Sequence, residues 1–291
     1  MVIDTADMNA RFATIVVPLD LEGHSDRSID VARSLAALGN VRIQLVTALP
    51  DQFTRTSGLV ALEERALTHG LRHWSPMVLL GTDVATMIAD HVATLDAPLV
   101  VMATSAHGVF GNFFSGSPTA RLLSLVASPV LVVGPHVPEP WSATAPTLMA
   151  CVGPASHADP AVGVMAQWTH TFGGRSPWFL EVLRPEDVRD GGGDVSESAL
   201  VKRRADRLAE LGVKSEWEVL HGDDPAEAIE SFADGMIEPV LLVNSERWND
   251  PNRLHLHSVA RRLAHHARQP VLVLPHADRD EPVSASTTAH R

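Results

Sequence analysis

The chain repeats itself at a fixed interval, and this repeat constrains its fold more than any other feature. The segment 97–133 recurs without a gap, 141 positions later, as 238–274. The apolar runs that close the two copies, Val130–Val133 and Val271–Leu274, are matched across the same interval. An interval of this length is that of a whole domain rather than of a short solenoid unit. The 291 residues therefore predict two copies of one domain, residues 1–140 and 141–291.

Composition and charge narrow the class of protein. Apolar residues make up 45% and charged residues 20%, as in ordinary soluble globular proteins. No apolar run approaches the roughly 20 residues of a membrane helix, and residues 1–10 do not resemble a signal peptide. The formal net charge of −12 argues against nucleic-acid or anionic-membrane partners. A single cysteine, Cys151, excludes an internal disulfide and fits a reducing cytoplasm. We therefore expect a cytoplasmic protein that binds neither nucleic acid nor membrane.

Each copy alternates short apolar runs with amphipathic stretches. In the first copy we expect strands at 12–19, 41–49, 77–80, 99–103 and 130–133, and helices at 25–38, 59–71, 84–95 and 119–126. Strands that alternate with helices imply a parallel sheet covered on both faces. The sequence therefore predicts an α/β fold of two repeated, doubly wound, five-stranded parallel-sheet domains of Rossmann-like type.

Three segments lie outside this alternation. Residues 135–146 hold four prolines without periodicity, so we expect a semi-rigid, extended spacer between the copies. An insertion around 184–195, with three consecutive glycines, interrupts the register of the second copy and is predicted to be a flexible loop. The polar tail from about residue 276 is predicted to be disordered.

The layout and motifs of both copies resemble the universal stress protein family in tandem form. The first copy has a strand followed by Asp20, then Gly81-Thr82-Asp83 before a helix, and it closes with SPVLVV at 128–133. The resemblance covers about 12–134 and 147–275. It implies a stress-response protein that acts by binding and signalling rather than as an enzyme. It also implies contacts between the last strands of the two copies.

A loop between the fourth strand and the fourth helix is similar among the ATP-binding members of this family. It reads Gly-x2-Gly-x9-Gly-Ser/Thr. Set in register from Met102, the first copy has Ala103 and Ala106 at the early glycines and keeps Gly116 and Ser117. In the second copy the same four positions hold Asn244, Arg247, His257 and Ser258. An alanine that needs a positive φ costs about 1–2 kcal/mol. The resemblance therefore implies a weakened site for ATP with Mg in the first copy and a degenerate site in the second.

Ligands of doubly wound sheets bind beyond the carboxyl ends of the strands, where the strand order reverses. The nucleotide-binding residues predicted at this edge of the first copy are Pro18, Asp20, Ala48, Met102, Ala103, Ala106, Gly116, Ser117 and Pro118. Ser117 followed by Pro118 indicates an N-cap with proline at the first helical position, where free N–H groups favour a phosphate. By resemblance, Asp20 holds the adenosine. The ordinary interpretation remains open, because Gly-Ser-Pro starts many helices and an aspartate after a strand often closes a turn.

Other candidate chemistry is weaker. Histidines gather near the last helix of the second copy: His255, His257, His265 and His266. His257 and His265 are two helical turns apart, which favours a solvated basic face over a metal site. Cys151 lies in an apolar run and is expected to be a small hydrophobe. No catalytic or zinc motif is present, so we predict no catalytic residues and no metal ligands.

The sequence is compatible with three functions. The first is an adenine-nucleotide-binding stress protein that uses its first domain. The second is a pseudo-dimeric scaffold that binds no nucleotide. The third is a slow ATP hydrolase, which lacks a visible catalytic base or carboxylate pair near Gly116. A homodimer is among the expectations.

Overall fold

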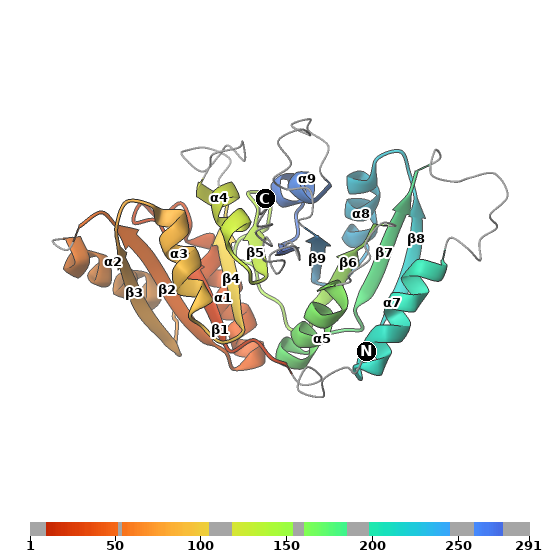
Figure 1. The fold of residues 1–291 in the computed structure, drawn as a ribbon, viewed down its shortest axis with the longest axis horizontal. Helices are drawn as coiled ribbons and strands as arrows, with labels where there is room; N and C mark the ends of the chain where they lie inside the picture. The colour runs from red at the N-terminus through yellow and green to blue at the C-terminus, as the bar shows by residue number, and fades with distance from the viewer. Residues whose placement is uncertain are drawn as a thin grey trace, which may run out of the picture.

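The computed structural model describes residues 10–51, 54–104, 118–153, 160–184, 198–244 and 259–275. Figure 1 shows these residues as one extended sheet with helices on both of its faces. Within the described ranges, no helix has both the length and the apolar character that crossing a bilayer requires. The predicted insertion and the predicted disordered tail lie almost wholly outside the described residues.

The two domains contain the same succession of elements. Domain 1 comprises β1 (Thr14–Pro18), α1 (Arg27–Gly39), β2 (Arg42–Leu49), α2 (Arg55–Thr68), β3 (Trp74–Leu80), α3 (Val84–Ala93), β4 (Pro98–Ala103), α4 (Pro118–Leu125) and β5 (Val130–Val133). Domain 2 comprises β6 (Thr147–Cys151), α5 (Pro160–Phe172), β7 (Trp178–Leu183), α7 (Ala199–Glu210), β8 (Glu216–His221), α8 (Pro225–Asp234), β9 (Pro239–Asn244), α9 (Val259–His266) and β10 (Val271–Leu274).

All of these strands belong to one ten-stranded sheet with the order β3-β2-β1-β4-β5-β10-β9-β6-β7-β8. Neighbouring strands are parallel within each domain, which confirms the predicted doubly wound, five-stranded domains. Strands β5 and β10 pair antiparallel, with Leu131 opposite Leu272. The implied contact between the last strands is therefore confirmed, and it joins the two sheets edge to edge.

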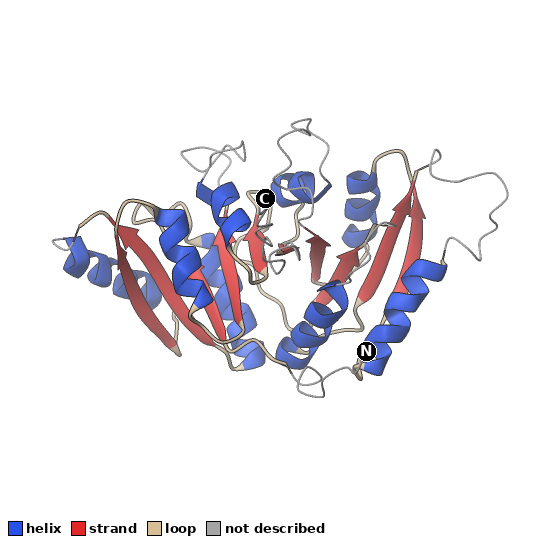
Figure 2. Ribbon diagram, in the orientation of Figure 1, coloured by secondary structure: helices blue, strands red, loops and turns tan. Residues whose placement is uncertain are grey.

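Two hydrophobic cores lie on opposite faces of this sheet, and each extends through both domains. One core packs the sheet against α1, α2, α5 and α7, and the other packs it against α3, α4, α8 and α9 (Figure 2). At the boundary between the two domains, the ring of Phe12 stacks on that of Phe172, with 5.8 Å between the ring centroids. The N–H of Phe12 donates a hydrogen bond to Thr171 Oγ1 at 2.9 Å. Because burial of apolar surface is shared across the boundary, the two copies stabilise one another.

The duplication extends to unusual backbone conformations. Asn40, which follows α1, has φ 52°, and the matching Gly173 after α5 has φ 66°. Ala97 before β4 and Glu238 before β9 have φ 40° and 50°. Positive φ costs a residue with a Cβ about 1–2 kcal/mol. The same tight turns therefore recur in both copies although the residues that form them differ.

The proline-rich segment between the copies does not behave as the predicted spacer. Val137, Trp141 and Ala143 are buried in it. The N–H of Ala143 donates to Ser34 Oγ on α1 at 2.9 Å. The carboxylate of Glu238, in domain 2, accepts hydrogen bonds from the N–H groups of Thr144 and Ala145 at 2.8 and 2.7 Å. Apolar side chains between the prolines thus attach this segment to both domains.

Two glycine-to-alanine changes are expected to have opposite effects on stability. In Gly39→Ala the new Cβ would lie 2.9 Å from Thr171 O and 3.0 Å from a ring carbon of Phe172, so we expect a loss of about 1–3 kcal/mol. Gly163 is exposed within α5, and a Cβ added to it would have no neighbouring atom within 4 Å. Gly163→Ala should therefore raise the free energy of unfolding by about 0.5–1 kcal/mol. Urea denaturation measures both, and stabilisation by both changes would contradict the close approach of α1 to α5.

Candidate functional site

The carboxyl edge of the sheet in domain 1 is the candidate site, because strand order reverses between β1 and β4. Pro18 ends β1 beside Val46, and Ala103 ends β4 beside Val133. Ala48 lies one residue before the end of β2 and is half-buried. These three predicted residues are therefore brought to the same edge.

Asp20 organises the loop that leads from β1 to α1. Its Oδ1 accepts hydrogen bonds from the backbone N–H groups of Glu22, Gly23 and His24 at 3.0, 2.8 and 3.2 Å. Its own N–H donates to Ser25 Oγ at 3.0 Å. One carboxylate oxygen thus closes the turn, as the ordinary interpretation of this residue expects. The other oxygen, Oδ2, lies 4.0 Å from His24 Nδ1 and accepts no hydrogen bond from the described residues.

The two residues that open the predicted nucleotide loop have different environments. Met102 is only 6% exposed and belongs to the core under α3 and α4, so its side chain is structural and only its backbone is available to a ligand. Ala103 is not among the described residues with positive φ. Alanine in place of the family's glycine therefore causes no backbone strain at this position. Ala106, Gly116 and Ser117 lie outside the described residues, and Pro118 begins α4.

Sequence reasoning missed Thr104, which follows β4 directly. It is 1% exposed, and its N–H donates to Val133 O at 3.0 Å. Its hydroxyl is buried and finds no hydrogen-bond partner among the described residues. An unsatisfied buried hydroxyl costs about 1–3 kcal/mol. The signal was available in the sequence, because Thr104 is the first polar residue after the apolar run of β4.

Domain 2 fills the equivalent edge with its own side chains. Gly153 stands where domain 1 has Asp20, and its carbonyl accepts from Arg204 Nη2 on α7 at 3.2 Å. Glu181, in the middle of β7, is 1% exposed, and Arg204 is 5% exposed. Burial raises the pKa of Glu181, and the nearby charge of Arg204 opposes that rise. Domain 2 therefore lacks the carboxylate at this edge and places a guanidinium across it.

The corresponding positions in domain 1 are less polar. The strand registers match Glu181 to Thr47, whose hydroxyl donates to Leu19 O at 3.0 Å. Helices α2 and α7 end with equivalent backbone hydrogen bonds, and counting back from these ends places Arg204 of α7 at the position of Leu62 of α2, which is fully buried. Sequence reasoning also missed this buried pair of charges. A single acid in the apolar run WFLEVL, followed by a base on the apolar face of a helix, was the available signal.

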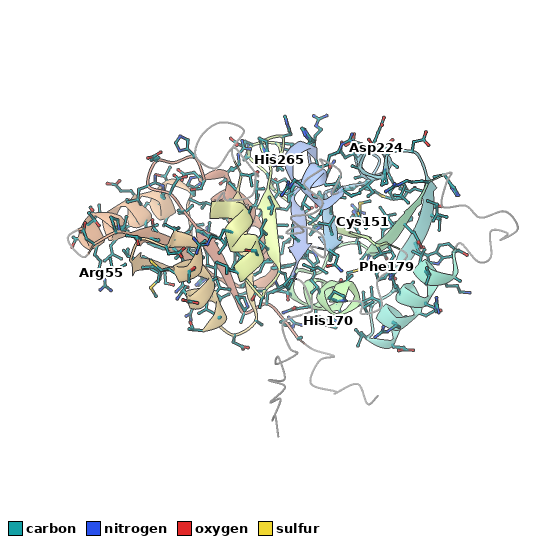
Figure 3. The ribbon with its side chains drawn as sticks, turned by 45° about the horizontal axis from the view of Figure 1, so that its top comes forward. Arg55, Cys151, His170, Phe179, Asp224 and His265 are labelled. Carbon is teal, nitrogen blue, oxygen red and sulfur yellow. The ribbon has the colours of Figure 1, made fainter. Side chains whose placement is uncertain are left out.

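Burial shifts the pKa of Cys151 and that of His265, a histidine of α9, in opposite directions. Burial raises the pKa of Cys151 to about 12, which keeps its thiol protonated. Burial lowers the pKa of His265 to about 4, with further lowering by His266 and Arg261. Figure 3 shows Cys151 on the sheet and His265 on α9. The described residues contain no group of three metal-ligating side chains. His255 and His257 lie outside those residues.

Comparison with known proteins agrees with this architecture. The sequence model of the Universal stress protein family matches residues 11–134 and 180–275. A universal stress protein from Archaeoglobus fulgidus DSM 4304 is 14% identical with a TM-score of 0.65, covering 93% of this chain and 99% of that one. A functionally unknown protein from Pseudomonas aeruginosa PAO1 is 16% identical with a TM-score of 0.59, and the match covers 94% of this chain and 95% of that one. No curated protein sequence matches the chain.

One further structure, a universal stress protein in complex with cAMP, is 25% identical over 43% of this chain and 98% of that one. Its TM-score is 0.35. The family match covers both copies of the repeat and most of the chain. The chain therefore belongs to the universal stress protein family, with two domains of that family in tandem.

Proposed function

We propose that this protein binds an adenine nucleotide in domain 1 and acts in the stress response through that binding. The expected ligand is ATP with Mg, held weakly. Domain 2 acts as a structural partner that binds no nucleotide. The role is one of binding and signalling in the cytoplasm, without a committed reaction.

One observation carries this proposal: the equivalent edges of the two domains offer opposite chemistry. In domain 1, Asp20 is fixed through Oδ1 by three N–H groups, while Oδ2 accepts no hydrogen bond from the described residues. A fixed carboxylate with an available oxygen suits the hydroxyl groups of a ribose, because little entropy is lost on binding. In domain 2, the backbone at Gly153 is already bonded to Arg204. The buried hydroxyl of Thr104 adds a second polar group that a ligand at the edge of domain 1 would satisfy.

Thermal melting with millimolar Mg-ATP tests this proposal. For a dissociation constant near 0.1 mM, 1 mM ligand stabilises the bound domain by about 1.4 kcal/mol. We expect this to raise the Tm by roughly 2–4 °C. A melt that does not move at millimolar ATP would contradict nucleotide binding.

A matched pair of variants locates the site. Asp20→Asn keeps an oxygen for the three N–H groups but replaces the other oxygen with an amide nitrogen, so the ligand-free melt should change little while the ATP-induced shift shrinks. Glu22→Gln removes one charge from the same loop at an exposed position and should leave the shift unchanged. Equal loss of the shift in both variants would point to general loop charge rather than to Asp20.

The pseudo-dimeric scaffold is the second candidate, favoured by the continuous sheet across β5 and β10. It predicts no nucleotide among the small molecules released when freshly purified protein is denatured. Mass analysis of that fraction separates the two candidates, because retained adenine nucleotide would count against the scaffold.

A further inference from the structure

An ion pair between two helices occurs in both domains. In domain 1, Nη2 of Arg121, in the first turn of α4, donates to Asp83 Oδ2 at 2.5 Å. Asp83 caps the N-terminus of α3 by accepting from the N–H of Thr86 at 3.3 Å. In domain 2, Arg262 on α9 pairs in the same way with Asp224, which caps α8. The repeat preserves this pair at both sites.

The surroundings of the two arginines differ in charge. Three and six residues after the capping aspartate, domain 1 has Thr86 and Ala89, and the acid of α3 itself is Asp90. The matching positions in domain 2 are Glu227 and Glu230. Burial raises the pKa of Glu230, and the charges of Arg262 and His266 oppose that rise, so these groups interact. Among the described residues, Arg121 has an ion pair with Asp83 alone, whereas Arg262 interacts with Glu230 of α8 in addition to its pair with Asp224.

Arg121 has unused hydrogen-bonding capacity. Its side chain is 53% exposed, and its contacts with Asp83 and Thr86 both use Nη2. A guanidinium carries five N–H donors in a fork that fits phosphate oxygens. In the part of the chain that the structure describes, no residue accepts from Nε or Nη1 of Arg121.

The position of Arg121 links this capacity to the candidate site. Helix α4 is the element that follows β4, and in a parallel domain its first turn lies at the carboxyl edge of the sheet. Asp20 follows β1 at that edge, and Thr104, whose buried hydroxyl has no described partner, follows β4 there. A cation paired with one described carboxylate, Asp83, therefore lies at the same edge of the sheet as Asp20 and Thr104.

We propose that Arg121 contacts the phosphate groups of the nucleotide in domain 1, so that the site selects nucleoside polyphosphates over nucleosides. This inference rests on the proposed function, since it concerns the same site. Asp83 competes with the phosphates for the guanidinium and holds Arg121 in place when no nucleotide is bound. Arg262 performs no such role, because acidic side chains of α8 compensate its charge.

Calorimetric titration of the full chain with Mg-ATP and with adenosine tests the assignment. Arg121→Gln should weaken ATP binding about tenfold and leave adenosine binding unchanged, since it removes one charge-assisted contact to phosphate. Arg262→Gln breaks the equivalent ion pair and should change neither affinity. Asp83→Asn should tighten ATP binding, because asparagine still caps a helix but no longer neutralises Arg121. Ligand-free melts verify that each variant is folded.

The outcomes separate this inference from the proposed function. Wild-type ATP affinity in Arg121→Gln would overturn the role of Arg121 and leave nucleotide binding by domain 1 intact. Equal losses of ATP and adenosine affinity, or equal losses in Arg262→Gln, would show a structural role and also overturn it. If Arg121→Gln does not fold, unchanged or weaker ATP binding by Asp83→Asn overturns the inference. Failure of the wild-type chain to bind either ligand would overturn the proposed function and this inference together.

Discussion

Leu272→Ala is expected to lower the free energy of unfolding by about 2–5 kcal/mol. Leu272 is fully buried in β10, directly opposite the fully buried Leu131 of β5 in the antiparallel pair that joins the domains. Truncation removes contacts from a core shared by both copies and leaves a cavity that the two paired strands cannot readily close. Urea denaturation followed by tryptophan fluorescence measures the loss.

Two controls distinguish the contact between β5 and β10 from an ordinary core position. Leu67→Ala, at a side chain that is 72% exposed, should change stability by no more than about 0.5 kcal/mol. Leu131→Ala combined with Leu272→Ala should show a coupling energy of about 0.5–3 kcal/mol, because the two side chains are cross-strand neighbours. Strict additivity would contradict direct pairing of β5 with β10.

Arg204→Leu should destabilise the chain by about 3–5 kcal/mol at pH 7. The change leaves Glu181, which is 1% exposed, without the cation that opposes the burial-induced rise of its pKa. A carboxyl whose pKa is higher in the folded state favours folding below its unfolded pKa and loses that contribution as pH rises through the folded value. The loss in the free energy of unfolding caused by Arg204→Leu should therefore be smaller when urea denaturation is repeated at pH 5.

Domain 1 supplies the matched rescue for this change. Glu181→Thr together with Arg204→Leu installs the pair that domain 1 has at Thr47 and Leu62. The double variant should regain at least the wild-type stability, because uncharged packing removes the desolvation cost of both ions. A double variant no more stable than Arg204→Leu would show that Glu181 is not the source of the penalty.

The fold could be predicted from the sequence because strand and helix periods alternate cleanly and the alternation occurs twice. Helix α5 begins at Pro160 and ends before Gly173, as proline and glycine signals indicate. Helix α2 was predicted to begin at residue 59 but begins at Arg55. A Cβ at Gly58 would lie 2.7 Å from a Leu49 side-chain atom, so this glycine permits close helix–strand packing rather than ending the helix. Such tertiary contacts have no local sequence signal.

The candidate site was predictable only in part. Asp20 and Ala103 could be placed at the carboxyl edge from strand order alone, because parallel strands end at the same edge. The pairing of Arg204 with Gly153, and that of Arg121 with Asp83, joins residues tens of positions apart in the sequence. Neither pair has a spacing rule, so only the packed structure identifies them.

The number of ATP molecules bound per chain tests the central claim, that one of two equivalent domains retains the nucleotide site. Native mass spectrometry at saturating Mg-ATP counts them directly, and Asp20→Asn provides the matched control for the location. The account predicts one ATP per chain, with a clear loss of occupancy in Asp20→Asn. Two molecules per chain, none, or one whose occupancy is unaffected by Asp20→Asn would contradict it.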